Sequence, residues 1–272
     1  MSEGSRNAAE PRIGDQSHVD QSSEERPYQE AALKAYCAAH DLEPEWLAKL
    51  IVACLAVPGS THVAVAKQMQ QSGIDAVSIA ERYVPAAARL LGEQWCSDQS
   101  DFARVTVGCS RLHRVLRDVA TAWRGPELTD PSAQSLLIVV ESGTYHTLGA
   151  TVLSGALRRS GFAVRLLVGA EQADLEAHLQ NSDYAAVFIS ASGVESLETV
   201  RRFVDLIRNV ASLKLPVVIG GPITRADETT AHEILVLTGA DYCTDDPNEA
   251  LDLCGLAQHK RAEPMTGSTQ RA

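Results

Sequence analysis

Residues 136–149 read LLIVVESGTYHTLG, an apolar run followed by a short polar segment that carries His146 between two glycines. Five consecutive apolar residues bounded by polar ones are typical of a strand that is buried on both faces. The segment from Glu141 onward predicts a loop, and the residues after it predict a helix. The stretch therefore indicates a strand–loop–helix unit with a histidine in its loop.

Four further apolar segments predict the rest of a sheet. They lie at 164–168, 185–190, 216–219 and, more weakly, 241–244, with amphipathic helical segments between them. Continuously apolar strands that alternate with helices pair in parallel. Right-handed crossovers then give a five-stranded, doubly wound, Rossmann-like or flavodoxin-like α/β domain over residues 132–258.

The preceding region, residues 28–125, has helical periodicity and few strand signals. Helix starts are indicated by Pro44, Asp75 and Asp101. Four or five helices with short links predict a bundle, which ends at a Gly-Pro break. Residues 1–27 and 259–272 have almost no large apolar side chains, so we expect a disordered arm and a flexible tail.

The composition is that of a globular protein, with 45% hydrophobic and 22% charged residues. No apolar run approaches the ~20 residues that span a bilayer, and no secretory signal is expected. The six cysteines form no CxxC pair, which favours reduced thiols and a cytoplasmic location. The net charge of −11 argues against a broad nucleic-acid surface, because phosphate binding needs clustered Lys and Arg.

The candidate site lies in three loops of the predicted sheet. Ligands of such sheets bind beyond the carboxyl ends of the strands. The loops after strands one, three and four carry His146, Ser190-Ala191-Ser192 and Gly220-Gly221. A neutral imidazole can bind a borderline transition metal, and serine hydroxyls can donate hydrogen bonds. The paired glycines let a ligand lie against bare backbone, and Gly149 leaves space between helix and strand.

These loops resemble those of B12-binding domains. The run 143–149 resembles the cobalamin-binding loop Asp-x-His-x-x-Gly, with Thr144 in place of Asp. Ser190-Ala191-Ser192 stands where the family has Ser-x-Leu, with 40 residues between Gly149 and Ser190. Gly220-Gly221 stands where the family has Gly-Gly, with 27 residues between it and Ser192.

The resemblance implies that His146 is the lower axial ligand of cobalt and that Gly149 opens a slot for the displaced nucleotide tail of the cofactor. The cofactor-binding residues that it implies in this domain are Gly143, Thr144, Tyr145, His146, Thr147, Leu148, Gly149, Ser190, Ser192, Gly220 and Gly221.

The helical region resembles the bundle that caps the upper face of cobalamin in this family. Residues 90–95, LLGEQW, match its Gly-x-x-Trp helix end, which implies that Trp95 lies over the corrin. In light-sensing relatives that hold adenosylcobalamin, Glu-His follows this Trp by ten and eleven residues. Val105 and Thr106 stand there in this chain. The departure implies hydroxo- or aquocobalamin in preference to adenosylcobalamin.

Among B12-binding proteins the chain is most similar to the AerR/PpaA-type photosynthesis-gene antirepressors, which are related to the haem-linked SCHIC sensor domains. The resemblance implies a light- or redox-sensing transcriptional regulator, not an enzyme, that contacts a DNA-binding repressor of the CrtJ/PpsR type and no membrane. Thr144 lacks the charge with which the family's Asp supports the ligating His in methyl transfer. Two alternatives stay open: a corrinoid carrier subunit of a methyltransferase, and a haem sensor with His146 as axial ligand.

The predicted helix 101–124 offers two further candidates. Its arginines could contact the repressor, although a solvated face is the simpler interpretation; they are Arg104, Arg111, Arg114, Arg117 and Arg124. Cys109 and His113, one helical turn apart, could bind a metal only with more ligands, so a core role is favoured. Asp245-Asp246 is expected to cap a helix that begins at Pro247.

Overall fold

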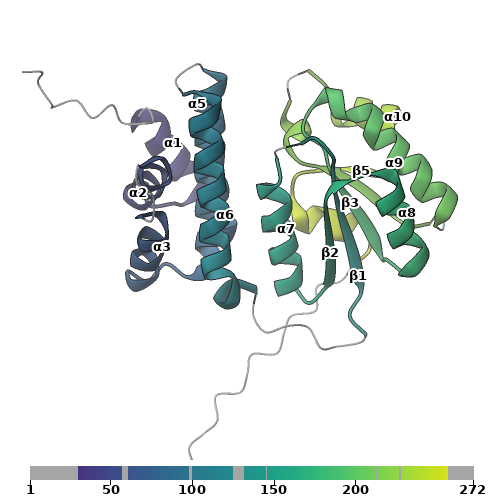
Figure 1. Cartoon of the computed structure of the whole chain (residues 1–272), viewed down its shortest axis with the longest axis horizontal. Coiled ribbons are helices and arrows are strands. Elements are labelled where there is room, and N and C mark those ends of the chain that lie inside the picture. Colours follow the sequence, from purple (N-terminus) through teal and green to yellow (C-terminus); the bar gives the residue numbers. More distant parts are fainter. Residues whose placement is uncertain are drawn as a thin grey trace, which may run out of the picture.

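The computed structural model describes residues 30–56, 61–97, 100–124, 132–144, 146–211, 214–226 and 228–256. These residues form two lobes that lie side by side, a helical bundle and an α/β domain (Figure 1). The predicted arm, 1–27, and tail, 259–272, fall outside the described residues.

The bundle follows the helical periodicity of its sequence. Its elements are α1 (Glu30–His40), α2 (Pro44–Leu55), α3 (Thr61–Gln71), α4 (Ala76–Ser78), the π-helical turn η1 (Ile79–Tyr83), α5 (Val84–Cys96) and α6 (Phe102–Arg124). Pro44 opens α2, and the Asp75 carboxylate accepts a hydrogen bond from the Ser78 N–H at the start of α4. The Asp101 carboxylate likewise accepts from the Arg104 N–H, at 2.7 Å. The predicted helix starts at these three positions are confirmed.

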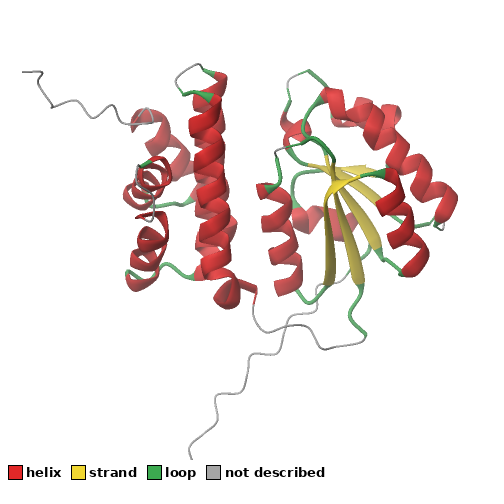
Figure 2. Cartoon of the chain, viewed as in Figure 1, coloured by secondary structure: helices red, strands yellow, loops and turns green. Residues whose placement is uncertain are grey.

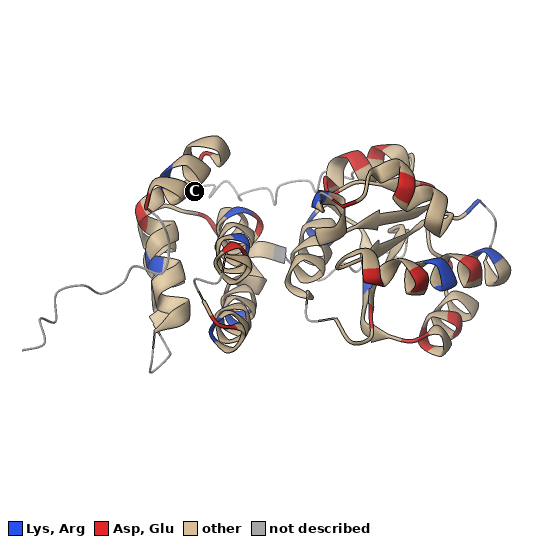
Figure 3. Cartoon of the chain, turned by 90° about the horizontal axis from the view of Figure 1, so that it is seen from above, with Lys and Arg blue, Asp and Glu red and all other residues tan. Residues whose placement is uncertain are grey.

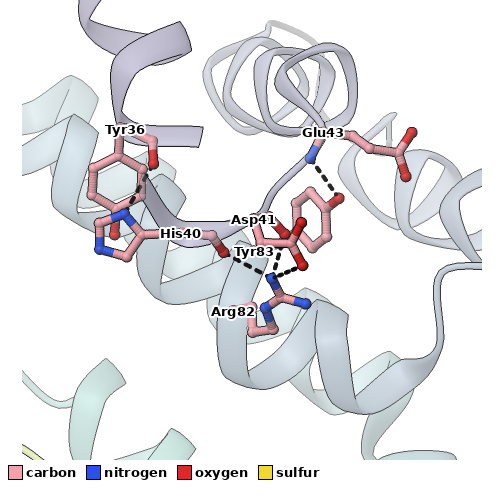
Figure 4. A network of polar contacts seen from close by, with 6 residues as sticks. All are labelled: Tyr36, His40, Asp41, Glu43, Arg82 and Tyr83. Atoms are coloured by element: carbon pink, nitrogen blue, oxygen red, sulfur yellow. Dashed lines mark hydrogen bonds and ion pairs between the residues drawn. The ribbon is translucent and has the colours of Figure 1, made fainter. Parts of the chain in front are cut away.

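The predicted helix from Asp75 towards Trp95 contains a π-helical turn that the sequence did not indicate. The extra residue in η1 makes neighbouring side chains face two different partners. Arg82 Nη2 points to the corner between α1 and α2, where it donates to the carbonyl oxygens of His40, at 2.8 Å, and Asp41 (Figure 4). The Tyr83 hydroxyl accepts from the Glu43 N–H, at 3.1 Å. The turn therefore anchors this corner to the bundle.

The five strands form one parallel sheet in the order β2-β1-β3-β4-β5, which confirms the predicted doubly wound fold. They are β1 (Ser135–Glu141), β2 (Ala163–Ala170), β3 (Ala186–Ser190), β4 (Val217–Gly220) and β5 (Tyr242–Cys243). Residues 136–141 of β1 are all buried, as expected for a central strand between two layers of helices.

Helices cover both faces of the sheet (Figure 2). They are α7 (Leu148–Arg159), α8 (Gln172–Asn181), α9 (Leu197–Val210), α10 (Ala231–Thr238) and α11 (Pro247–Leu253). Leu136, Ile138 and Val140 of β1 pack with α7 and α11, and Leu137 and Val139 pack with α8, α9 and α10. The alternation of β1 side chains thus joins two apolar cores. Asp246 accepts hydrogen bonds from the N–H groups of Asn248 and Glu249, so the predicted cap of the last helix is confirmed.

The two lobes meet where α7 packs on the bundle. The ring of Trp123, at the end of α6, is buried against Gly155 of α7, where an added Cβ would lie 2.1 Å from the ring. Glu81, from the π-helical turn, accepts hydrogen bonds from the indole N–H of Trp123 at 2.8 Å and from Arg159 of α7 at 2.8 and 2.9 Å. We call these four residues the lobe clamp. They fix the end of α6 on the middle and end of α7.

Among the described residues, no helix is both long enough and apolar enough to span a membrane. Acidic and basic side chains are interspersed over the helices of both lobes (Figure 3). The arginine face predicted on α6 is not uniformly exposed, because Arg111 Nη1 donates to the carbonyl oxygens of Cys54 and Ala56, at 2.8 and 2.6 Å. Arg111 therefore joins α6 to α2, and its place in an exposed repressor-binding face was wrong.

Candidate cofactor site

The three loops singled out in the sequence lie side by side at one edge of the sheet. Strands β1, β3 and β4 are neighbours, and in a parallel sheet their carboxyl ends share an edge. Ser190 at the end of β3 pairs in register with Val140 of β1 and Gly220 of β4. The His146, Ser192 and Gly221 segments therefore follow directly from adjacent strand ends. We call this edge the rim.

His146 stands on an exposed loop between β1 and α7. Gly143 takes φ +84°, a backbone conformation that favours glycine, and the chain turns there. The Thr144 hydroxyl accepts a hydrogen bond from the backbone N–H of His146 at 3.3 Å, so it orders the loop and does not contact the imidazole ring through this bond. The imidazole side chain is exposed, and Tyr145 lies outside the described residues.

Gly149, in the first turn of α7, borders open space. A Cβ built on it would meet no heavy atom within 4 Å, and the same holds for Gly143. Further along α7, Ser154 shares the sheet-facing side of the helix with Ala150, four residues before it. Ser154 is 1% exposed, and its hydroxyl has no hydrogen-bond partner in the described structure. An open space and an unsatisfied buried hydroxyl on one helix suit a ligand group that enters beside α7.

A buried carboxylate joins the first and second loops, and the sequence analysis missed it. Glu141, the last residue of β1, is 9% exposed and accepts a hydrogen bond from the Ser196 hydroxyl. Ser196 in turn contacts the Ser192 hydroxyl at 2.8 Å and receives the Ser192 N–H at 3.4 Å. The sequence feature that could have indicated this site is an acidic residue, Glu141, at the end of a fully apolar strand. No sequence feature indicated its partner Ser196, which is 55 residues away.

In the third loop, the close approach of neighbouring backbone requires glycine at position 221. Gly221 has φ +98°, and an added Cβ would lie 2.7 Å from the Ala191 carbonyl oxygen and 2.9 Å from Ser190 Oγ. A Cβ at Gly220 would lie 3.0 Å from the Thr244 carbonyl oxygen. Close packing of the loops therefore already requires glycine at Gly221, and the contact of Gly220 and Gly221 with a ligand stays a prediction.

Trp95 is in the last turn of α5, and this end of the bundle points to the same side of the molecule as the rim (Figure 1). Trp95 is 46% exposed at the end of α5, and its ring meets Phe102 of α6 edge-on with a centroid distance of 6.0 Å. The Thr106 hydroxyl donates to the Phe102 carbonyl oxygen within α6, and Val105 carries no polar group. An exposed aromatic pair therefore lies at this end of the bundle, and the contact of Trp95 with a corrin stays a prediction.

His113 brings α6 to the loop of His146. Its Nε2 lies 3.2 Å from the hydroxyl of Thr147, the residue that precedes α7. Burial and the positive charge of Arg117 lower the pKa of His113, which favours the neutral ring. Across the described residues, no group of three or more His, Cys, Asp or Glu side chains is arranged to hold a metal. His113 thus takes part in the contact between the lobes through Thr147.

Taken together, these residues fit a cobalamin held at the rim. His146 offers an exposed imidazole, a ligand type that suits cobalt. Gly149 and the unsatisfied Ser154 hydroxyl provide space and a polar contact beside α7. Leu148 and Thr147 begin that helix, and Leu148 is buried against the bundle.

Comparison with known proteins agrees with this geometry. Residues 135–251 match the B12 binding domain. The chain is 31% identical over 168 residues to an uncharacterized 20.5 kDa protein in the bchF-crtJ intergenic region of Rhodobacter capsulatus; the match covers 62% of this chain and 85% of the relative. The solved monomethylamine corrinoid protein of Methanosarcina barkeri superposes with a TM-score of 0.59 at 14% identity, covering 77% of this chain and 94% of that one, which shows a shared fold.

The family match spans the whole of the sheet and reaches α11, so it includes all three loops of the rim. The resemblance drawn from the loop around His146 is confirmed at the level of the family. This chain belongs to the family of proteins with a B12-binding domain.

Proposed function

We propose that this protein is a cobalamin-binding transcriptional regulator, an antirepressor that binds a DNA-binding repressor of the CrtJ/PpsR type in response to its cofactor, light or redox state. The relative from Rhodobacter capsulatus supports the gene context, since its name places it beside crtJ. The observation that carries the cofactor part is the exposed His146 on a rim loop next to the open space at Gly149.

In this proposal His146 would bind the cobalt of the corrinoid through its imidazole, and Gly149 and Ser154 of α7 would hold the nucleotide tail. Trp95, whose ring packs edge-on against Phe102 at the end of the bundle, would contact the corrin ring. When bound, the corrinoid supplies a cobalt centre whose upper ligand responds to light or to redox state. The chain places Val105 and Thr106 where an acid and a second histidine would polarise an upper ligand, which supports hydroxo- or aquocobalamin over adenosylcobalamin.

We expect no catalytic role for this chain. The Thr144 hydroxyl bonds to the His146 backbone N–H and carries no charge, so the chain lacks a carboxylate at this position to take up a proton when the imidazole leaves cobalt. The corrinoid-carrier alternative has the fold of the Methanosarcina barkeri protein in its favour. A corrinoid carrier must accept a methyl group repeatedly in its reduced state, whereas a regulator need not, so repeated methylation distinguishes the two.

The test is the visible absorption spectrum of the full chain after addition of hydroxocobalamin in dim light. We expect a protein-bound corrinoid spectrum in the wild type, and its loss in His146→Ala. His178→Ala, on α8 at the opposite edge of the sheet, is the matched control and should bind as the wild type does.

An unchanged spectrum in His146→Ala would remove this residue as the ligand of cobalt. A Soret band after haem addition, without corrinoid uptake, would favour the haem sensor. Methylation of the reduced protein by a methyl donor, turnover after turnover, would favour the carrier.

A further inference from the structure

A groove that follows the second rim loop collects exposed apolar side chains of the α/β domain. It lies between the start of α9 and the helix α10 and has a volume of about 510 Å³. Val194, Val236 and Leu237 line it and are 41%, 65% and 52% exposed, while the buried Leu197 lies beneath them. Exposed apolar side chains that gather at one groove mark an interaction surface.

The groove has an acidic border. Glu228 and Glu233 line it, and Glu195 and Glu198 lie on the adjoining turn and helix. Within the described residues, Glu195, Glu228 and Glu233 form no ion pair, whereas Glu198 pairs with Arg202 at 4.0 Å. The basic groups at the groove are His232, which lines it, and Arg201, whose Nη1 donates to the Leu237 carbonyl oxygen at 3.2 Å. Hydrogen bonds from Thr230 lower the pKa of Glu233, so the carboxylate of this residue keeps its charge at neutral pH.

The shape and the charge select among possible occupants. A small molecule would stay largely in solvent here, because the apolar lining is itself about half exposed, whereas ligand pockets bury most of their ligand. Nucleic acid and anionic lipid surfaces would be repelled by the glutamates. A second copy of this chain in a twofold contact would place the acidic border against itself.

We propose that this groove docks a basic amphipathic helix of a protein partner, with its apolar side chains between Val194 and Val236 and its Lys or Arg side chains over the glutamates. This is the helix-in-groove mode of recognition, in which apolar anchors supply affinity and the charged border supplies orientation and selectivity. The inference rests on the proposed function for the partner's identity as a repressor and for the link between the groove and the cofactor.

The groove is connected to the rim by the hydrogen bonds of Ser196. Val194 and Leu197 flank this residue in the turn η2 (Val194–Ser196) and at the start of α9. Ser196 bonds both to Glu141 at the end of β1 and to Ser192 in the second rim loop. A ligand that engages the Ser192 hydroxyl would therefore shift the wall of the groove, which links cofactor occupancy to partner docking.

The probe is a fluorescein-labelled amphipathic helix built of Leu and Lys, with a Leu and Glu peptide of the same pattern as its counterpart. Binding to the full chain is measured by fluorescence anisotropy, with and without hydroxocobalamin. Val236→Asp should weaken Leu/Lys binding by about tenfold or more, as expected for an anchor position. Val168→Asp is the matched control, an exposed valine (54%) on β2, and should change binding by less than about twofold.

A second pair of variants tests charge without touching the apolar lining. Glu228→Lys should weaken binding of the Leu/Lys peptide several-fold, and Glu176→Lys on α8 should not. Equal losses in Val236→Asp and Val168→Asp, or equal affinity of the wild type for the Leu/Glu peptide, would overturn the docking groove. Identical peptide affinity with and without bound corrinoid would overturn the link to the rim.

The corrinoid spectrum, recorded for each variant, separates this inference from the proposed function. If the wild type takes up no corrinoid but still binds the Leu/Lys peptide more tightly than Val236→Asp does, the cofactor proposal fails and the inferred docking groove is retained. If corrinoid binds normally and the peptide preference is absent, the groove inference fails alone.

Discussion

The substitution Gly155→Ala tests whether the lobe clamp fixes the bundle on α7. Considered as a helix position alone, this change should stabilise the protein by about 1 kcal/mol, because glycine is a poor helix former. The structure predicts the opposite sign. The new Cβ would lie 2.1, 2.2 and 2.7 Å from three ring atoms of Trp123, which is 1% exposed and held by Glu81.

The magnitude follows from these two opposing effects. Overpacking of a tight site costs typically 1–3 kcal/mol, and three close contacts with a buried ring place this site at about the upper end of that range. After subtraction of the helix-propensity gain, we expect a net loss of about 2 kcal/mol in the free energy of unfolding. Gly92→Ala on α5 is the matched control, because no heavy atom lies within 4 Å of its new Cβ, and it should gain up to about 1 kcal/mol.

Urea unfolding followed by far-UV circular dichroism, with tryptophan fluorescence on the same samples, measures both variants. The midpoint should fall for Gly155→Ala and rise for Gly92→Ala, at an unchanged slope. A Gly155→Ala protein at least as stable as the wild type would refute the clamp as described, since it would show that the lobes separate or slide without cost.

Three further predictions use other parts of the structure. Burial raises the pKa of the Cys54 thiol to about 12. At pH 8 iodoacetamide should therefore label the exposed Cys96 long before Cys54, which peptide mass spectrometry measures. Equal labelling rates of the two thiols would contradict the burial of Cys54. Burial and the charge of Arg117 lower the pKa of His113. The contribution of the neutral ring to stability is therefore complete above the ordinary pKa of 6.5 and is lost as the pH falls below that value. Urea midpoints should fall between pH 7 and pH 5 in the wild type, and they should fall less in His113→Gln. Asp246→Ala removes the cap of α11 and should cost about 1 kcal/mol in the same unfolding assay, and no loss would show that this cap is dispensable.

The sequence predicted the fold because its signals are local. An apolar run such as 136–140 specifies a doubly buried strand through its own composition, and helix caps such as Asp75 act on residues within one turn. The positions of His146, Ser190 and Gly220 at strand ends then placed them together, since parallel strands end at a shared edge. Family membership followed from the same loops.

The finer arrangement of the site was beyond these local signals. Thr144 was matched to the family's Asp by its position in the loop, and the sequence did not indicate its hydrogen bond with the His146 backbone N–H. Nothing in the sequence indicated that Gly221 packs so closely on the backbone of Ala191 that an added Cβ would lie 2.7 Å from its carbonyl oxygen. Arg111 was placed on an exposed face, although it donates to carbonyl groups of α2 and of the residue after it. Each of these contacts depends on which residue the fold brings near, and the type of side chain alone does not predict that neighbour.

By itself, the sequence determined the order of helices and strands, the common edge of the three loops and the family of the chain, because periodicity and spacing are properties of the chain alone. Only the tertiary structure decided which distant side chains meet. Glu141 and Ser196 are 55 residues apart, Glu81 and Trp123 are 42 apart, and Glu81 and Arg159 are 78 apart. Contacts between residues so far apart in the sequence form only when the lobes and the sheet have packed, so no local sequence pattern predicts them.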